Sequence, residues 1–230
     1  MTSNSPGLWI CIDGLDFTGK GTQTSELIRR LIATNEDNVI TYTHEPTRDA
    51  RKIKDKLKAE RGDAYKDSRV MAELYIDDRA NNEFHVIRPA LRSGGVVVSN
   101  RHKYSTLAYQ VAQGMDINEL IKMHKDKEIG TPDISLLLFL DDEDAIRERM
   151  LRTGKSGDKF ESDFEFQKKV ADNYRKIVEL AKDDDFFGKV YPVHSDKGTS
   201  IFDVADCIWK SIRPCYDLWT KIRDFGTGNI

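Results

Sequence analysis

The feature that most constrains the fold is a glycine-rich turn at residues 14–23, which reads Gly-Leu-Asp-Phe-Thr-Gly-Lys-Gly-Thr-Gln. It follows a short apolar run, residues 8–13, and precedes residues 20–33, where leucine and isoleucine recur at helical spacing. This order is typical of a P-loop, in which backbone N–H groups and the helix N-terminus surround a phosphate while a lysine neutralises it. A turn that merely joins a strand to a helix is the alternative.

The P-loop interpretation predicts a set of residues that bind the phosphates of ATP. These are Gly14, Phe17, Thr18, Gly19, Lys20, Gly21 and Thr22. Gly21 departs from the usual pattern, because a serine or threonine hydroxyl at that place normally binds Mg²⁺. Thr22 offers a hydroxyl one residue later, although it leaves the helix in a different direction.

The rest of the chain alternates between strand and helix patterns. Further strands are predicted at residues 38–43, 96–99, 134–140 and 190–193. Helices are predicted at residues 49–60, 68–91, 105–113, 118–127, 143–152, 164–182 and 200–212. The alternation indicates one α/β domain, residues 1–213, with a five-stranded parallel sheet between two helical layers. We expect residues 214–230 to form a loosely ordered tail.

Length, charge and cysteine content exclude several classes of protein. A chain of 230 residues suits one ordinary domain, and its net charge of -3 argues against a broad nucleic-acid-binding surface. Three cysteines without metal-binding spacing make a disulfide framework or zinc site improbable. The sequence shows neither a membrane-spanning run nor a signal-type segment, so we expect a cytoplasmic protein with no membrane partner.

Two segments narrow the class of nucleotide-binding protein. Residues 74–79 read Leu-Tyr-Ile-Asp-Asp-Arg and residues 86–91 read Val-Ile-Arg-Pro-Ala-Leu. Residues 100–110 read Asn-Arg-His-Lys-Tyr-Ser-Thr-Leu-Ala-Tyr-Gln, directly after a predicted strand. Together with the P-loop, these segments resemble thymidylate kinases, within the nucleoside monophosphate kinase family of P-loop proteins. The resemblance extends over about residues 8–212 and implies a three-layer P-loop kinase fold with a helical lid.

The resemblance implies how the acceptor nucleotide is held. Asp16 would accept from the sugar 3′-hydroxyl, Tyr75 would stack on the base and Arg79 would reach the base edge and the phosphate region. Arg101 would hold the acceptor phosphate, and Tyr109 would press against the sugar C2′ and disfavour ribonucleotides. Three further residues would lie near the base: Ser105, Thr106 and Gln110. The alternative is a polar helix start with Tyr75 and Tyr109 in the core.

Two positions before these helices depart from the family pattern. Asn100 stands where the family carries an aspartate close to Mg²⁺, so the negative charge is lost. Either ATP and water hold the metal with reduced turnover, or another acid such as Asp16 compensates. In residues 44–48, Arg48 is the candidate for the acceptor phosphate, while His44 occupies a usual arginine place. An exposed loop arginine is the alternative for Arg48.

Residues 152–161 resemble the family's lid, whose cations close over ATP. Because Phe17 replaces a P-loop arginine, the basic catalytic residues are predicted here, at Arg152 and Lys155, with Lys159 a further candidate. A basic loop without a role is the alternative. Arg147 and Arg149 flank the lid and also fit a solvated helix face.

The resemblance therefore implies a kinase that transfers the ATP γ-phosphoryl group to dTMP, giving dTDP and ADP. Lys20, Arg101, Arg152 and Lys155 would be catalytic, and Mg²⁺ would be bound near Asn100 and Thr22 through water. ATP and a deoxynucleoside monophosphate would be the partners, in a homodimer of the kind the family forms. Two alternatives stay open: a kinase for other or several nucleoside monophosphates, and a nucleotide-binding protein with weak catalysis.

Overall fold

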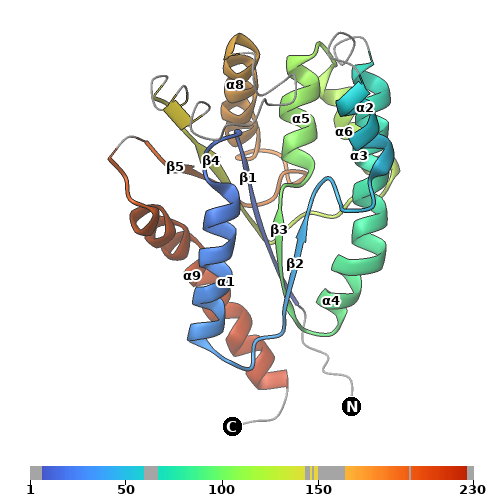
Figure 1. Ribbon diagram of the computed structural model, residues 1–230. Coiled ribbons are helices and arrows are strands. Elements are labelled where there is room, and N and C mark those ends of the chain that lie inside the picture. The colour runs from blue at the N-terminus through green and yellow to red at the C-terminus, as the bar shows by residue number, and fades with distance from the viewer. Residues whose placement is uncertain are drawn as a thin grey trace.

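A central parallel sheet organises the computed structural model, which describes residues 7–59, 67–142, 146, 148–149, 164–196 and 198–226. The strands are β1 (Leu8–Gly14), β2 (Ile40–His44), β3 (Val96–Asn100), β4 (Ile134–Phe139) and β5 (Val190–His194). Their order is β2-β3-β1-β4-β5, and every neighbouring pair is parallel (Figure 1). The predicted five-stranded parallel sheet is confirmed, and the carboxyl ends of its strands meet at one edge.

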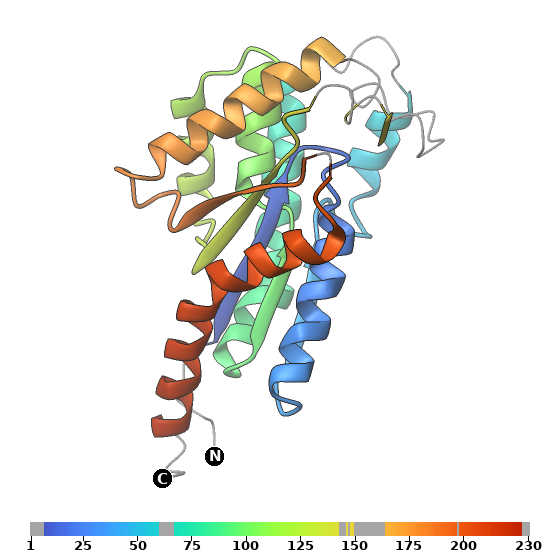
Figure 2. The ribbon, with the colours of Figure 1, turned by 90° about the vertical axis from the view of Figure 1, so that its left-hand side faces the viewer.

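Helices cover both faces of the sheet, as the predicted three-layer fold requires (Figures 1 and 2). One face carries α1 (Lys20–Thr34) and α9 (Ile201–Gly226). The other carries α3 (Ser68–Asn82), α4 (Arg88–Arg92), α5 (Lys103–Ala112), α6 (Ile117–Asp126) and α8 (Phe164–Leu180). The short helix α2 (Arg51–Ala59) contacts α3.

Successive side chains along each strand point to opposite faces of the sheet, so the core is divided between the two faces. In β1, Leu8, Ile10 and Ile12 belong to the cluster under α1 and α9. Cys11, between them, belongs to the cluster under α5 and α8. All seven residues of β1 and all six of β4 are buried, as is typical of parallel strands covered on both faces. The sheet is therefore a rigid platform for the loops at its carboxyl edge.

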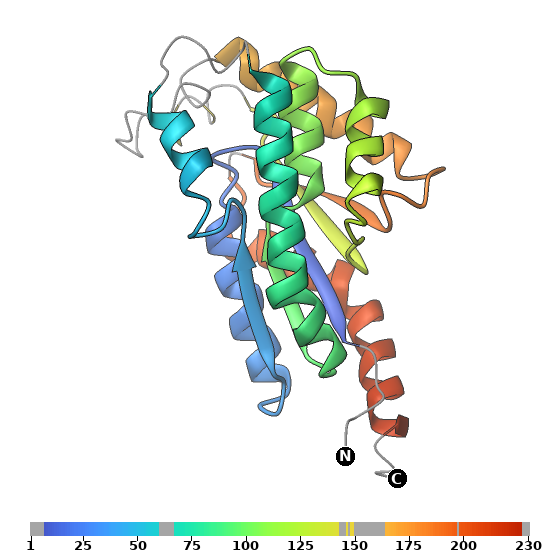
Figure 3. The ribbon, with the colours of Figure 1, turned by 90° about the vertical axis from the view of Figure 1, so that its right-hand side faces the viewer.

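The long helix predicted at residues 68–91 contains a wider turn. Between α3 and α4 lies the π-helical segment η1 (Glu83–Ile87), and the whole run is continuous in Figure 3. Pro89 follows in the first turn of α4, where it has no N–H to donate. The π turn buries Glu83, whose exposed fraction is 1%. A helical period alone could not show this extra residue per turn.

The expected loose tail after Pro214 is wrong as far as Gly226, because α9 continues through the proline. Figure 2 shows this helix changing direction along its length, as expected where a proline removes a backbone hydrogen bond. Beyond Pro214, Tyr216 and Trp219 are buried in the core under α1. The Asn38 side chain also binds this part of α9, donating to the Tyr216 hydroxyl over 2.8 Å and accepting from Arg223 over 3.3 Å. Burial of these aromatic side chains explains why the helix persists.

Two predictions concern residues that lie outside the described ranges. Most of the predicted helix at residues 143–152 and the whole lid at residues 152–161 belong to this group. Within the described ranges, no helix is long and apolar enough to cross a membrane.

Candidate active site

The turn between β1 and α1 has the backbone of a phosphate-binding loop. Gly14, Phe17 and Gly19 have φ angles of 129°, 64° and 86°. A Cβ on Gly14 would lie 2.3 Å from the Leu138 carbonyl oxygen, so only glycine fits this close approach to β4. The backbone N–H groups of residues 16–22 have no acceptor among the described residues. These donors, at the N-terminus of α1, can bind an anion.

Lys20 lies over this loop with 8% of its surface exposed. Its Nζ donates to the Leu15 carbonyl oxygen and lies 3.5 Å from Asp16 Oδ1. Burial lowers the pKa of Lys20 to about 8, and the nearby Arg101 charge acts in the same direction, while Asp16 opposes it. A bound phosphate would supply the negative charge that favours the ammonium form.

A cavity of about 130 Å³ opens beside the P-loop. All predicted acceptor-binding residues except Arg48 line it: Asp16, Tyr75, Arg79, Arg101, Ser105, Thr106, Tyr109 and Gln110. Asp16 belongs both to the P-loop and to this cavity, which we call the acceptor pocket. The structure therefore brings the two predicted nucleotide sites together at the carboxyl edge of the sheet, where α/β folds bind ligands.

Arg101 and Asp16 form an ion pair across the acceptor pocket. Arg101 also donates to Ser105 Oγ over 2.9 Å, and the Tyr109 hydroxyl donates to Asp16 Oδ2 over 2.5 Å. Burial alone would raise the pKa of Asp16, but the charges of Arg101 and Lys20 outweigh burial and hold the pKa well below its usual value. The pocket thus holds a charged guanidinium next to the P-loop.

Asp13, which the sequence analysis did not select, fixes the backbone on either side of Arg101. It is fully buried, and its Oδ2 accepts from the N–H groups of His102 at 2.9 Å and Ser105 at 3.1 Å. Its Oδ1 accepts from Ser105 Oγ at 2.6 Å and the Tyr174 hydroxyl at 2.9 Å. Arg101 has a left-handed φ of 72°, which this network holds in place. The signal available in the sequence was an acidic residue at the end of an apolar strand.

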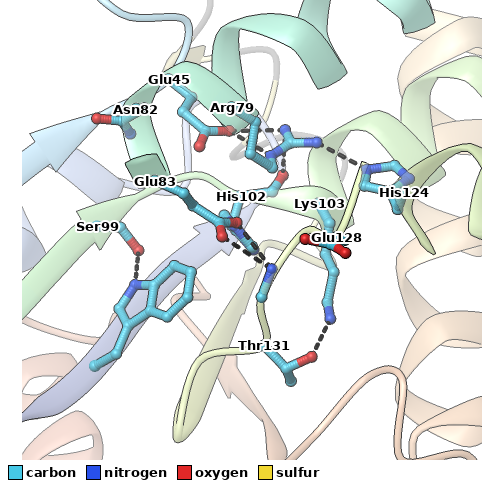
Figure 4. Close-up of polar contacts among 12 residues, drawn as sticks. Glu45, Arg79, Asn82, Glu83, Ser99, His102, Lys103, His124, Glu128 and Thr131 are labelled. Atoms are coloured by element: carbon cyan, nitrogen blue, oxygen red, sulfur yellow. Dashed lines mark hydrogen bonds and ion pairs between the residues drawn. The ribbon is translucent and has the colours of Figure 1, made fainter. Parts of the chain in front are cut away.

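Arg79 also lines the acceptor pocket, and 1% of its surface is exposed (Figure 4). It donates to Glu45 Oε2 over 2.7 Å and to His124 Nε2 over 2.8 Å. It also donates to the His102 carbonyl oxygen over 3.0 Å and to Thr106 Oγ1 over 3.1 Å. The chain itself supplies a carboxyl partner for this buried arginine, Glu45. Glu45 and His124 were both missed.

Two predicted residues, Arg48 and Thr22, lie outside the acceptor pocket, and a third, Ser105, lines it with its hydroxyl already bound. Arg48 is exposed and does not line the acceptor pocket. The backbone N–H of its neighbour Thr47 donates to Asp78 Oδ2 over 2.8 Å. Thr22 is exposed in the first turn of α1. Ser105 lines the pocket, but its hydroxyl binds Asp13 and Arg101. The roles predicted for these three residues, like those of the other site residues, stay predictions.

Asn100 and Thr22 are the predicted positions for Mg²⁺, and Asp16 is a further candidate oxygen ligand beside the P-loop. Asn100 is the half-buried last residue of β3, aligned with Ile12 of β1 and His44 of β2. Asp13 is fully engaged in hydrogen bonds, and Asp16, whose side chain is 14% exposed, accepts from Arg101 and from the Tyr109 hydroxyl. One carboxylate and one amide oxygen fit Mg²⁺, which usually takes few protein ligands and completes its shell with phosphates and water.

Arg149 connects the P-loop to the end of β5. It donates to the Phe17 carbonyl oxygen over 3.1 Å and to the Ser195 carbonyl oxygen over 2.8 Å. Arg149 is therefore part of the phosphate-loop surroundings rather than of a solvated helix face. The catalytic roles predicted for Arg152 and Lys155 concern residues outside the described ranges.

Comparison with known proteins agrees with this geometry. Residues 12–187 match the family model of thymidylate kinase. A probable thymidylate kinase of Thermococcus gammatolerans is 35% identical over 183 residues, covering 76% of this chain and 84% of that protein. The thymidylate kinase of Pelotomaculum thermopropionicum is 36% identical over 182 residues, or 76% and 82% of the two chains. The crystal structure of thymidylate kinase from Ehrlichia chaffeensis superposes with a TM-score of 0.70 at 23% identity, over 90% of this chain and 100% of that one, which shows a shared fold.

Proposed function

The chain belongs to the thymidylate kinase family, and we propose that it transfers the γ-phosphoryl group of ATP to the 5′-phosphate of dTMP, giving ADP and dTDP. The observation that carries the proposal is the position of Asp16, which belongs both to the P-loop and to the acceptor pocket. This residue lines the acceptor pocket with Arg101, while the Lys20 ammonium lies 3.5 Å from its carboxylate. A donor phosphate on the P-loop and an acceptor phosphate on Arg101 would meet there.

The donor phosphates are assigned to the P-loop. The N–H groups of residues 16–22 provide a ring of donors, and Lys20 provides the positive charge. Because these groups are in place before ATP binds, little reorganisation is needed as charge moves between the phosphoryl oxygens.

The acceptor phosphate is assigned to Arg101. A guanidinium offers two parallel N–H donors to a phosphate, and Asp13 holds the backbone around Arg101 in position. In the free protein Asp16 forms an ion pair with this guanidinium, so the incoming phosphate would compete with Asp16 for the N–H donors of Arg101. The nucleophile is an oxygen of the acceptor phosphate itself, so the site needs no strong protein base and acts by positioning and charge.

Tyr75 and Gln110 are assigned to the base, and Asp16 and Tyr109 to the deoxyribose. Tyr75 on α3 and Gln110 on α5 line the same cavity as Arg79. The Tyr75 ring offers a face for stacking, and Gln110 is 3% exposed with an Oε1 that has no partner among the described residues. An unpaired buried acceptor favours a ligand that carries an N–H group.

Mg²⁺, the lid and the homodimer belong to the proposal as well. Asp16 and Asn100 would hold the ion, which when bound neutralises charge on the phosphates. Arg152 and Lys155 would close over ATP. For the homodimer, support comes from exposed apolar side chains along α3 and η1, namely Val70, Phe84 and Val86.

The proposal is tested by measuring ADP release with ATP, Mg²⁺ and each common ribonucleoside and deoxyribonucleoside monophosphate. We expect the highest kcat/KM with dTMP, because the stacking face, the amide and the sugar contacts suit a deoxypyrimidine. If another monophosphate is a better acceptor than dTMP, the proposed phosphoryl transfer stands and the proposed substrate is wrong. Measurable ATP binding without turnover on any acceptor would instead indicate a nucleotide-binding protein.

Replacing Asn100 with aspartate tests the assigned metal position. We expect a lower half-saturating Mg²⁺ concentration and a kcat raised by up to about tenfold, equivalent to about 1.4 kcal/mol in the barrier. The added carboxylate restores a negative charge at the end of β3, where the ion would bind. Asn118→Asp on the exposed start of α6 is the matched control, since it adds the same charge away from the site. Equal Mg²⁺ curves for both variants would contradict the assignment.

A further inference from the structure

Gln113 lines the acceptor pocket beside Gln110, whose side chain is assigned to the base. Gln110 lies within α5 with 3% of its surface exposed, and Gln113 is the half-buried residue that caps the C-terminal end of this helix. The Gln110 Nε2 donates to Gln113 Oε1 over 3.1 Å. Residues three apart lie on the same face of a helix, which brings the two amides together at the pocket.

The hydrogen bond to Gln113 fixes which end of the Gln110 amide is left for a ligand. With Nε2 on Gln113, the Gln110 Oε1 is buried and has no partner among the described residues. A Gln110 amide turned by 180° would instead bring its own oxygen against the oxygen of Gln113, and two acceptors cannot pair. Gln110 can therefore reverse only if Gln113 reverses with it, so the second amide controls the direction of the first.

Thymine and cytosine differ in what they offer to such an amide. Thymine carries an N–H at N3 next to a carbonyl oxygen at C4, whereas cytosine carries a lone pair at N3 next to an amino group at C4. An amide that presents Oε1 to N3 and its second Nε2–H to the C4 oxygen matches thymine. The reversed amide matches cytosine at the same two atoms. The direction of the Gln110 amide is therefore a choice between the two bases.

We propose that Gln113 is a positioning residue that sets base selectivity, because it holds the Gln110 amide in the direction that fits thymine. This inference rests on the proposed function, since it takes Gln110 as a contact of the acceptor base. Gln113 acts through Gln110 and not on the reacting atoms, and no covalent bond is made or broken in these contacts. Uracil shares the N3–H and the C4 oxygen of thymine, so the pair of amides should treat uracil and thymine alike.

The test locks the Gln110 amide in each direction by substitution at position 113. Gln113→Glu offers only acceptor oxygens, so the Gln110 Nε2 must stay on it. Gln113→Lys offers only N–H donors, so the Gln110 Oε1 must turn toward it. Gln113→Leu offers neither and releases the Gln110 amide. Because Gln113 is only half-buried at the end of α5, we expect all three variants to fold, which thermal unfolding checks.

The measured quantity is the ratio of kcat/KM for dTMP to kcat/KM for dCMP, from ADP release at saturating ATP. We expect Gln113→Glu to keep or raise the wild-type ratio. Gln113→Leu should lower the ratio by about threefold to tenfold, the effect of one hydrogen bond. Gln113→Lys should lower it by about tenfold or more, because the reversed amide favours cytosine. Both nucleotides carry the same 5′-phosphate, so the effect of a charge at position 113 on that phosphate cancels in the ratio.

The controls are a third nucleotide, dUMP, and two variants on α6. The ratio for dTMP to dUMP should stay at its wild-type value in every variant, whereas a structural disturbance of the pocket would weaken all three nucleotides together. Asn118→Glu and Asn118→Lys place the same charges on an exposed residue that does not line the pocket, so they should leave every ratio unchanged. Calorimetric Kd values for the three nucleotides without ATP should show the same order and separate binding from turnover.

The possible failures are distinct. Equal dTMP-to-dCMP ratios in wild type, Gln113→Glu and Gln113→Lys overturn the inference, and so does a ratio that Gln113→Lys raises. In both cases dTMP turnover by the wild type leaves the proposed function intact. If the wild type neither binds nor phosphorylates dTMP, the proposed function fails and the inference fails with it.

Discussion

Replacing Lys20 with alanine is expected to lower kcat for dTMP phosphorylation by about 10²-fold to 10³-fold. Lys20 is the buried cation of the P-loop, 3.5 Å from Asp16 at the junction of the two sites. Its charge would act on the donor phosphates as negative charge moves toward ADP, and alanine leaves only the backbone donors. Steady-state ADP release at saturating ATP and dTMP measures the loss.

Lys122→Ala is the control for Lys20→Ala. The Lys122 side chain is 75% exposed on α6 and pairs only with Asp126 among the described residues, so its removal should leave kcat unchanged. Thermal unfolding separates a catalytic effect from misfolding. Burial lowers the pKa of Lys20, so this lysine destabilises the fold at neutral pH, and Lys20→Ala should not lower the Tm. A kcat near that of the wild type would remove Lys20 from the proposed mechanism.

Arg101→Ala is expected to lower kcat/KM for dTMP by about 10²-fold to 10³-fold with little change in KM for ATP. The guanidinium is assigned to the acceptor phosphate, and the network around Asp13 holds its backbone at a φ of 72°. Arg101→Lys should recover little of the loss, because an ammonium is a point charge and cannot make two parallel hydrogen bonds.

Arg48→Ala provides the comparison for Arg101→Ala. Arg48 was also predicted to contact the acceptor phosphate, but it is exposed and does not line the pocket. We expect its replacement to have a smaller effect than that of Arg101. A loss as large as that of Arg101→Ala would show that the loop after β2 moves onto the acceptor phosphate when dTMP binds.

The sequence predicted the sheet and the phosphate-binding loop because their signals are local, whereas most residues of the acceptor pocket were expected from the resemblance to thymidylate kinases. Buried strands such as β4 are continuous apolar runs, and the glycines of the P-loop stand at fixed spacing. Residues 100–110 run from the last residue of β3 through a short loop into α5. These patterns need little knowledge of distant contacts.

The parts that were missed depend on contacts between segments far apart in the chain. Glu45 meets Arg79 across 34 residues, and Arg79 meets His124 across 45, so no local pattern joins them. Pro214 predicted an end to the last helix, yet burial of Tyr216 and Trp219 outweighs the lost hydrogen bond. The role of Asp13 was not predicted, because a polar residue at a strand end is common and its partners lie on the distant helices α5 and α8.

The path of α9 has a practical consequence for handling the protein. Its last turns reach Asn38, just before β2 begins, and β1 begins beside the start of β3 (Figures 2 and 3). Both ends of the described chain therefore emerge from the edge of the sheet opposite the P-loop. A fluorophore or a surface tether attached at either end would leave the nucleotide sites facing solvent, so immobilised single molecules should turn over as the free protein does.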